Sequence, residues 1–401
     1  MLPKGWTQNA LRENIRIHSG QAPGNLDLLP KGEIPYVKVE DLNNCDKYQS
    51  HSREYLESCR SVVPAQSLIF PKRGAAIFAN KIRIAARPIA LDTNLMAVEI
   101  VKGLDTEYLY YAISFAGLHQ LADTSTIPQL NNKHVLPYVL ARPSLKEQRR
   151  IAHILSTWDQ AIATIEGLLA NACTQRKTLT NALFVHGRHS SMTTHGWKFA
   201  DLDEVFERVT RRNTTANSNV LTISGTRGLI SQRDYFNKSV ASENLSGYTL
   251  IERGEFAYNK SYSAGYPMGA IKPLTRYDQG VVSSLYICFR LRDGVEADAD
   301  FFRHYFEVGM LNEGLSEIAQ EGARNHGLLN VGVGDFFKLR LHIPDVTEQR
   351  RVAVILNMAE QKEQLITAQL DKLRDEKKAL MSQLLTGKRR VRLPADEAAH
   401  A

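Results

Sequence analysis

Six short segments of the sequence gather side chains that can hydrogen-bond the edges of nucleic acid bases. Arginine and lysine suit guanine, asparagine and glutamine suit adenine, and serine, threonine or tyrosine adapt to either. The segments are "PKRG", "NK" and "TSTIPQLNNKH" in the first half, and "SGTRGLISQRDYF", "YNKSYSAGY" and "EGARNHG" in the second. Glycine, proline and asparagine break the neighbouring apolar runs, which is typical of exposed turns. These side chains could therefore recognise bases through hydrogen bonds.

The candidate reading residues are taken from these turns. "EGARNHG" is favoured because an arginine fork and an amide lie together between glycines, although a lone histidine such as His326 is more typical of a structural or solvent-facing role. For any single residue, an ordinary solvated loop stays the alternative. The candidates are Lys72, Arg73, Asn80, Lys81, Thr126, Gln129, Asn132, Lys133, Arg227, Gln232, Arg233, Asn259, Lys260, Ser261, Tyr262, Arg324, Asn325 and His326.

Composition agrees with a polyanionic partner. The formal net charge is +7 over 401 residues, with a pI near 9.1, although many basic proteins bind no nucleic acid. The N-terminus has no apolar leader and no long apolar run follows, so we expect a cytoplasmic protein without membrane spans. The four cysteines lie far apart, which argues against a zinc site or a disulfide framework.

Motifs of catalysis are missing from the sequence. We find no phosphate-binding G-x-x-x-x-G-K-[ST] loop, no H-E-x-x-H, no G-x-S-x-G and no Asn-Pro-Pro-aromatic motif of adenine methyltransferases. We therefore expect that this chain is not an enzyme and holds no cofactor.

An internal repeat organises the chain. "LKEQRRIAHILSTWDQ" at residues 145–160 recurs 201 residues later as "VTEQRRVAVILNMAEQ", and Gly-Trp opens both halves at Gly5 and Gly196. Short β-type runs precede each copy, so we expect two similar mixed α/β units, each followed by a long helix. The expected boundaries are a first globular unit at 1–143, a helix at 144–187, a second globular unit at 188–343, a helix at 344–387, and a basic, disordered tail at 388–401.

Each long helix carries a heptad seam, which is typical of helices that pack along each other. Ser144 and Asp345 are placed to cap the starts, and Gly187 and Gly387 to end the helices. We expect antiparallel pairing about a pseudo-twofold axis, rather than each helix packing only on its own unit. The expected pairing residues are Ile151, Leu155, Trp158, Ile162, Ile165, Leu169, Val352, Leu356, Ile366, Leu370, Leu373 and Leu380.

Polar residues interrupt both seams at matching places, Arg176 and Lys377. In the antiparallel arrangement Arg176 would lie opposite Ala359 and Lys377 opposite Trp158. Four further arginines begin the helices, where the helix dipole favours anions instead. We therefore expect a partner carboxylate or a phosphate near Arg149, Arg150, Arg350 and Arg351.

The duplicated "PSLKEQRRIAHIL" and "PDVTEQRRVAVIL", each after a β-rich unit, resemble the specificity subunits of type I restriction–modification systems. The Gly-Trp openings and the Leu-Asn pairs at Leu130 and Leu329 fit as well. The resemblance implies two target-recognition domains joined by an antiparallel coiled coil, which read the two halves of an asymmetric bipartite target in double-stranded DNA. It also implies two methyltransferase subunits docked on the helices, and restriction (translocase) subunits in a larger complex. S-adenosylmethionine, ATP and Mg²⁺ would then belong to those partners.

Two other interpretations stay open. A transcriptional regulator with duplicated DNA-binding domains would need a recognition-helix motif, and none stands out. A coiled-coil scaffold without a nucleic acid partner would leave the polar, basic turns unexplained.

Overall fold

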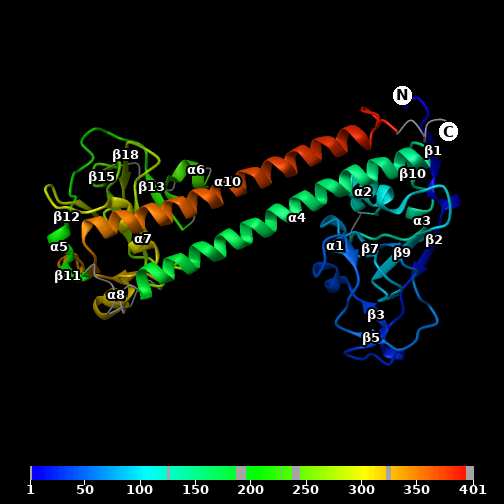
Figure 1. The fold of residues 1–401 in the computed structure, drawn as a ribbon, viewed down its shortest axis with the longest axis horizontal. Coiled ribbons are helices and arrows are strands. Elements are labelled where there is room, and N and C mark those ends of the chain that lie inside the picture. The colour runs from blue at the N-terminus through cyan, green and yellow to red at the C-terminus, as the bar shows by residue number, and fades with distance from the viewer. Residues whose placement is uncertain are drawn as a thin grey trace. The chain divides into compact units, whose positions relative to one another are not determined.

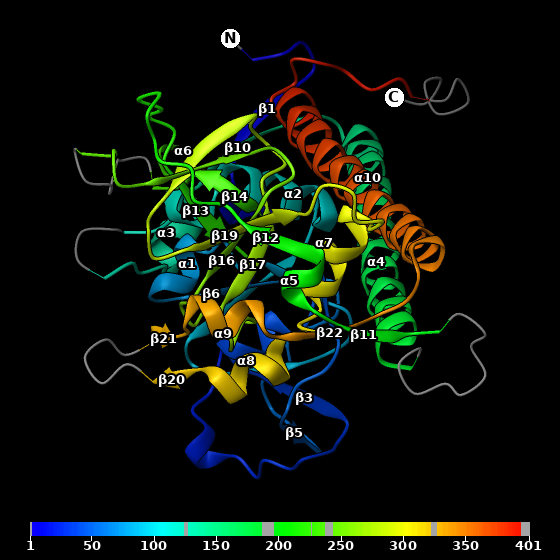
Figure 2. The same cartoon turned by 90° about the vertical axis from the view of Figure 1, so that its left-hand side faces the viewer.

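The computed structural model of the chain describes residues 2–123, 127–186, 196–225, 227–236, 244–321 and 327–393. The chain divides into two compact units (Figures 1 and 2). Unit 1 comprises residues 1–167 and 368–401, and unit 2 comprises residues 168–367. Each unit therefore contains one globular part and one end of each long helix.

The first segment of unit 1, residues 1–167, begins with short strands and runs into the first long helix. Its elements are β1 (Thr7–Ala10), β2 (Ile15–Ser19), β3 (Ile34–Val37), β4 (Tyr48–Gln49), β5 (Tyr55–Leu56), β6 (Leu68–Pro71), α1 (Ala75–Phe78), β7 (Arg83–Ala85), β8 (Ala90–Leu91), β9 (Leu95–Ile100), α2 (Thr106–Ala116), α3 (Asn132–Val135), β10 (Val139–Arg142) and the start of α4 (Leu145–Asn181).

Unit 2 repeats this plan with longer connections. Its elements are β11 (Lys198–Asp201), α5 (Leu202–Val205), β12 (Phe206–Arg208), β13 (Leu221–Ser224), β14 (Gly228–Ser231), α6 (Gln232–Phe236), β15 (Thr249–Glu252), β16 (Phe256–Asn259), β17 (Ala270–Pro273), β18 (Gln279–Val282), β19 (Ile287–Leu291), α7 (Ala299–Glu307), α8 (Asn312–Ile318), β20 (Gln320–Glu321), β21 (Leu329–Asn330), α9 (Val333–Phe337), β22 (Arg340–Ile343) and the start of α10 (Val346–Leu384).

The central sheets of the two units share one strand order. Unit 1 has β2-β9-β6-β7 followed by β4, and unit 2 has β12-β19-β16-β17. Even the turn before the central strand is equivalent, because the N–H of Gln66 donates to Ala85 (2.7 Å) and that of Gly254 donates to Leu274 (2.8 Å). Both turn residues have positive φ, at 63° and 90°. The two mixed α/β units are therefore structural repeats, as predicted.

The helix ends are part of each unit's hydrophobic core. In unit 1, Ile151 and Leu155 of α4 belong to the same buried cluster as Leu384 at the end of α10. In unit 2, Leu356 of α10 is buried with Phe184, which follows α4. Since the start of one helix meets the end of the other in both units, the helices pair antiparallel, as predicted. Figure 2 shows the two helices side by side.

Between these ends the seam is only half-buried. Ile162, Ile165 and Leu169 of α4 are intermediate in exposure, as are Ile366 and Leu373 of α10. Ala172 and Leu370, in contrast, are each 4% exposed. The other expected seam residues divide in the same way: Val352 is buried, while Trp158 and Leu380 are half-buried.

The partners expected for the two polar interruptions were wrong. Arg176 donates to the Glu363 carboxylate at 2.8 Å (Nε–Oε1) rather than facing Ala359. Lys377 forms an ion pair with Asp159, one residue beyond Trp158. In both cases the residue opposite is a carboxylate instead of the small or aromatic residue that was expected. Burial lowers the pKa of Arg176, but the hydrogen bond and charge of Glu363 outweigh this and raise it, which keeps the guanidinium charged.

Asp159 also ties the helix pair to the globular part of unit 1. It accepts a hydrogen bond from the Tyr111 hydroxyl, and the Lys377 ammonium lies 5.6 Å from the centre of the Tyr111 ring. The Tyr111 hydroxyl in turn lies 3.0 Å from Lys47 Nζ, which is also 3.0 Å from Glu107. Burial raises the pKa of Tyr111, so its phenol stays protonated and can donate. Two lysines and two carboxylates therefore alternate around one tyrosine.

The glutamine of the repeated Glu-Gln-Arg-Arg has the same structural role in both copies. Gln148 is 1% exposed, donates to the Pro143 carbonyl (3.0 Å) and accepts from the Asp105 N–H (3.0 Å). Gln349 makes the equivalent bonds to Pro344 (2.9 Å) and Asp298 (3.0 Å). Both aspartates cap the helix that follows them, α2 or α7. The repeated glutamine thus joins each long helix to its globular part.

The residues after α10 pack against unit 1. Arg390 forms a bidentate ion pair with Glu147, at 2.6 Å for both contacts. A side chain at Gly387 would meet Pro3 and Trp6, and Val391 packs against the hydrophobic core. The described part of the expected tail, residues 388–393, is therefore bound to unit 1 through Arg390, which differs from the expectation of disorder. Among the helices described, none is long and apolar enough to span a membrane.

Candidate nucleic-acid interface

Two of the predicted segments of unit 1 lie side by side. Arg73, in the turn after β6, forms an isolated antiparallel β-bridge with Gln129. Hydrogen bonds flank the bridge: the Leu130 N–H donates to Lys72 (2.9 Å), and the Gly74 N–H donates to Pro128 (3.0 Å). We call this pairing of residues 72–74 with 128–130 the unit 1 junction. It brings together candidates that are more than fifty residues apart in sequence.

Unit 2 contains the same arrangement. Ser261, in the turn after β16, forms an antiparallel bridge with Leu328. The Leu329 N–H donates to Lys260 (2.8 Å), and the Tyr262 N–H donates to Gly327 (2.7 Å). We call this pairing of residues 260–262 with 327–329 the unit 2 junction. Its second strand directly follows the segment "EGARNH".

The junction side chains are available for binding. Arg73 and Gln129 are exposed, Tyr262 is 62% exposed, and Lys72 and Lys260 are half-buried. Among the described residues, neither lysine ammonium has a carboxylate within ion-pair distance. Free cations beside exposed hydrogen-bonding groups can contact phosphates and base edges together.

Several other candidates are engaged within the fold. The Asn80 amide donates to Ser114 (2.8 Å) and accepts from the Leu118 N–H (2.9 Å). Asn259 accepts from the Ser261 N–H (3.2 Å) and so shapes the turn after β16. Asn80 thus fixes the backbone at the end of α2, and Asn259 fixes the turn at the unit 2 junction, which leaves both amides less free for a ligand.

The remaining described candidates lie on short elements of their units. In unit 1, half-buried Lys81 follows α1, and exposed Asn132 and Lys133 begin α3, just after the junction. In unit 2, Arg227 and Arg233 are exposed. The side-chain amide oxygen (Oε1) of Gln232 on α6 is buried without a hydrogen-bond partner in the described part of the chain.

A buried lysine that the sequence reasoning missed connects two turns of unit 2. Lys272, in the strand β17, donates to the Gly225 carbonyl (3.1 Å) and to the Tyr266 hydroxyl (2.8 Å), and pairs with Glu307. Tyr266 also donates to Gly225 at 3.0 Å. The β13–β14 turn, which carries Arg227, is thereby tied to the loop that follows the unit 2 junction. The available signal was a lone lysine within the apolar strand "AIKP".

Four predicted reading residues lie outside the described residues. They are Thr126, Arg324, Asn325 and His326.

The arginines that begin the long helices are exposed. Arg351 forms a bidentate pair with Glu348 of its own first turn, with both contacts at 2.6 Å. The carboxylate partner of Arg351 is thus within its own helix. Arg149, Arg150 and Arg350 have exposed side chains at the same end of each helix.

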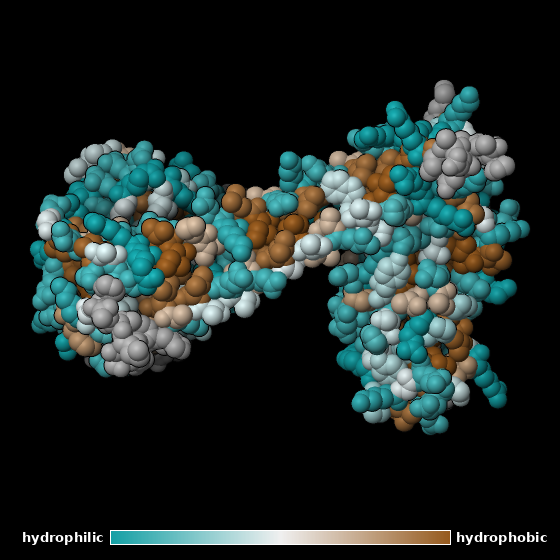
Figure 3. Space-filling model, in the orientation of Figure 1, coloured by the Kyte–Doolittle hydropathy of each residue, from teal (hydrophilic) through white to brown (hydrophobic). Residues whose placement is uncertain are grey.

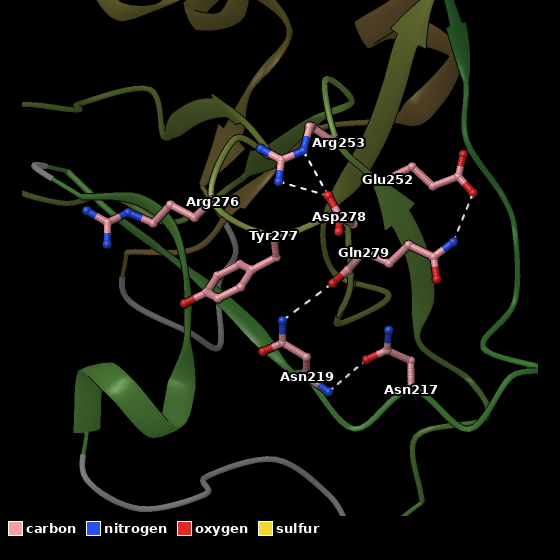
Figure 4. A pocket seen from close by; sticks show the side chains of 8 residues that line it. All are labelled: Asn217, Asn219, Glu252, Arg253, Arg276, Tyr277, Asp278 and Gln279. Carbon is pink, nitrogen blue, oxygen red and sulfur yellow. Dashed lines mark hydrogen bonds and ion pairs between the residues drawn. The ribbon is translucent and has the colours of Figure 1, made fainter.

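A shallow pocket of about 700 Å³ lies elsewhere in unit 2, between β15, the residues before β13 and the turn before β18. Its polar groups largely satisfy one another (Figure 4). Arg253 pairs with Asp278 (2.9 Å), and Gln279 donates to Glu252 (3.2 Å). None of the predicted reading residues lines it. Figure 3 shows a largely hydrophilic surface interrupted by apolar patches, one of them along the paired helices. Among the described residues, no group of three His, Cys, Asp or Glu could hold a metal ion.

Comparisons with known proteins show which chains this one is similar to. Residues 3–172 match the family model described as "Type I restriction modification DNA specificity domain". This match covers the globular part of unit 1 and most of α4.

A curated relative matches part of the chain, and two solved structures resemble its fold. The chain is 24% identical over 171 residues to the type I restriction enzyme MjaIX specificity subunit of Methanocaldococcus jannaschii, and the match covers 40% of this chain and 39% of that relative's length. The fold resembles a type I S subunit from M. genitalium, with a TM-score of 0.56, 15% identity and coverage of 98% of this chain and 100% of that one.

The second solved structure comes from work on "complex assembly" and "conformational transition" of the type I R-M system. Its chain has a TM-score of 0.58 and 14% identity, with coverage of 96% of this chain and 98% of that one. At such identities the likeness concerns the fold. The resemblance inferred from the repeated helix segments, two similar units with two long helices, is therefore confirmed.

Proposed function

We propose that this chain is the DNA sequence-specificity subunit of a type I restriction–modification complex. Each unit would read one half of an asymmetric bipartite target. The chain itself would be non-catalytic, and its methyltransferase and restriction partners would supply S-adenosylmethionine, ATP and Mg²⁺ chemistry.

The observation that carries this proposal is the equivalence of the two junctions. Both present a lysine at the same backbone position that has no carboxylate partner among the described residues, beside side chains that differ between the units. Two domains that recognise different sequences need a shared contact to the DNA backbone and different hydrogen-bonding groups for the bases. Because the family model covers residues 3–172, the role of unit 2 follows from its structural equivalence to unit 1.

The paired helices would set the length of the spacer between the half-sites. Their ends belong to the cores of the two units, so helix length is the natural ruler. Exposed Arg149, Arg150 and Arg350 would lie on the surface that docks two methyltransferase subunits. Arg351, already paired with Glu348, would contribute less.

Methylation mapping tests the proposed function. We expect DNA from cells that contain this chain to carry adenine methylation in two short, different motifs separated by a fixed spacer, and DNA from cells lacking it to lose that pattern. An adenine methyltransferase should co-purify with the chain. An unchanged methylation pattern, together with purification free of any methyltransferase, would contradict the proposal and favour a regulator or a scaffold.

A further inference from the structure

The two junctions contain one residue type that both units share and neighbouring residues that differ between the units. We infer that Lys72 and Lys260 make the same sequence-independent phosphate contact in the two units, and that base readout in unit 1 lies with Arg73 and Gln129. This inference rests on the proposed function and assigns roles within it.

The first support is that the two lysines occupy one structural position. Each follows the central strand of its sheet, β6 or β16, and the carbonyl of each accepts the N–H of a leucine, Leu130 or Leu329, at 2.9 and 2.8 Å. Both side chains are half-buried, and among the described residues neither ammonium has a carboxylate partner. The chain retains the same cation at the same place in two units whose loops otherwise differ.

The second support is that the neighbouring positions differ in chemistry. The bridge pair is Arg73 and Gln129 in unit 1 but Ser261 and Leu328 in unit 2. The two units also differ in backbone conformation directly after the bridge pair. Gly74, with φ of 77°, starts the short helix α1, whereas Tyr262 at the equivalent place leads into a loop. Identical backbone pairing therefore presents different side chains.

The chemistry of these groups fits the division. A lysine ammonium is a compact point charge, which suits a phosphate but carries little geometric information. The arginine fork and the glutamine amide can each make paired hydrogen bonds, to guanine and to adenine respectively. Serine and leucine cannot make those pairs, so unit 2 must read its half-site differently.

The roles can be separated by the salt dependence of binding. The full chain, in complex with its co-purified partner, would be titrated with a duplex carrying the mapped target and with a non-target duplex of equal length. Lys72→Ala or Lys260→Ala should reduce the slope of log K against log salt by about one. Either substitution should also lower the affinity for both duplexes equally, by about fivefold near 0.15 M salt. Lys72→Arg should restore the slope, since it keeps the charge.

Arg73→Ala should instead lower the preference for the target over duplexes altered in one half-site by about tenfold or more, with the other half-site still read. Lys102→Ala is the matched control. Lys102 is exposed and follows β9, which runs antiparallel to β6, so it lies at the opposite end of the sheet from Lys72. It should leave both the slope and the preference unchanged.

Each contrary result has a distinct meaning. If the native complex binds the target but Lys72→Ala leaves the salt slope unchanged, or lowers affinity for the target alone, the inference is overturned and the proposed function stands. An equal effect of Lys102→Ala would also overturn it, because the loss would then reflect net charge. If the native complex binds no duplex, the proposed function fails and the inference fails with it.

Discussion

Replacing Leu155 or Leu356 by alanine is expected to lower the free energy of unfolding of its own unit by about 2–5 kcal/mol. The two leucines are equivalent in the repeat, and each is 0% exposed. Leu155 lies in the core cluster of unit 1, and Leu356 in that of unit 2. Each truncation therefore removes packing where a long helix is part of a globular core.

Native-state hydrogen exchange, resolved by mass spectrometry, can follow the two units separately. Leu155→Ala should reduce protection mainly in unit 1, and Leu356→Ala mainly in unit 2. Leu168→Ala, at a side chain that is 48% exposed, should change stability by less than about 1 kcal/mol. Equal losses in both units after either core substitution would show that the units do not have separate cores.

Reversing the charge of Glu363 is expected to destabilise the helix pair by about 2–3 kcal/mol, because it places a second arginine against the partly buried Arg176. In the native pair the two side chains are only 15% and 34% exposed. The double variant, Arg176→Glu with Glu363→Arg, should recover most of the lost stability, because an arginine and a glutamate again face each other with their positions exchanged. Thermal unfolding of all four members of this double-mutant cycle measures the coupling.

The chain offers a matched control for burial. Glu166 and Arg374 also form an arginine–glutamate pair between the helices, at 2.6 Å, but they are 44% and 52% exposed. Glu166→Arg should therefore cost less than about 1 kcal/mol, because solvent screens exposed pairs. If both reversals have the same small effect, the Arg176–Glu363 pair has no role in holding the helices together.

The repeat and the heptad seams predicted the part of the fold that depends on local sequence. Helices α4 and α10 begin at Leu145 and Val346, directly after the predicted caps Ser144 and Asp345. Periodicity fixes such elements because the same apolar face must recur every few residues. It does not fix which residue lies opposite which across two helices, so the carboxylate partners of Arg176 and Lys377 were missed.

The junctions were only half predictable, for a similar reason. The polar turns stood out in sequence, but the pairing of Arg73 with Gln129 joins segments separated by the strands β7, β8 and β9 and by the helices α1 and α2. No local signal reports such a contact. The repeated Gln148 and Gln349 were likewise recognised as a pattern, whereas their buried bonds to Asp105 and Asp298 depend on how each long helix returns to its unit.

In the proposed function, the paired helices hold two different DNA-reading units at a set distance. The most direct test inserts three heptads into each helix, after Gly167 in α4 and after Thr367 in α10, where the two units divide. This lengthens the pair by about 32 Å, close to one turn of B-DNA, so the extension preserves the rotational phase between the two half-sites on the duplex. The same insertion in one helix alone is the control, and should abolish pairing.

Methylation mapping with the doubly extended chain gives the result. Both half-sites should keep their sequences while the spacer grows by about ten base pairs, roughly one helical turn. Half-sites that keep both their sequences and their original spacing would contradict the claim, because the length of the helices would then have no influence on the distance between the sequences read.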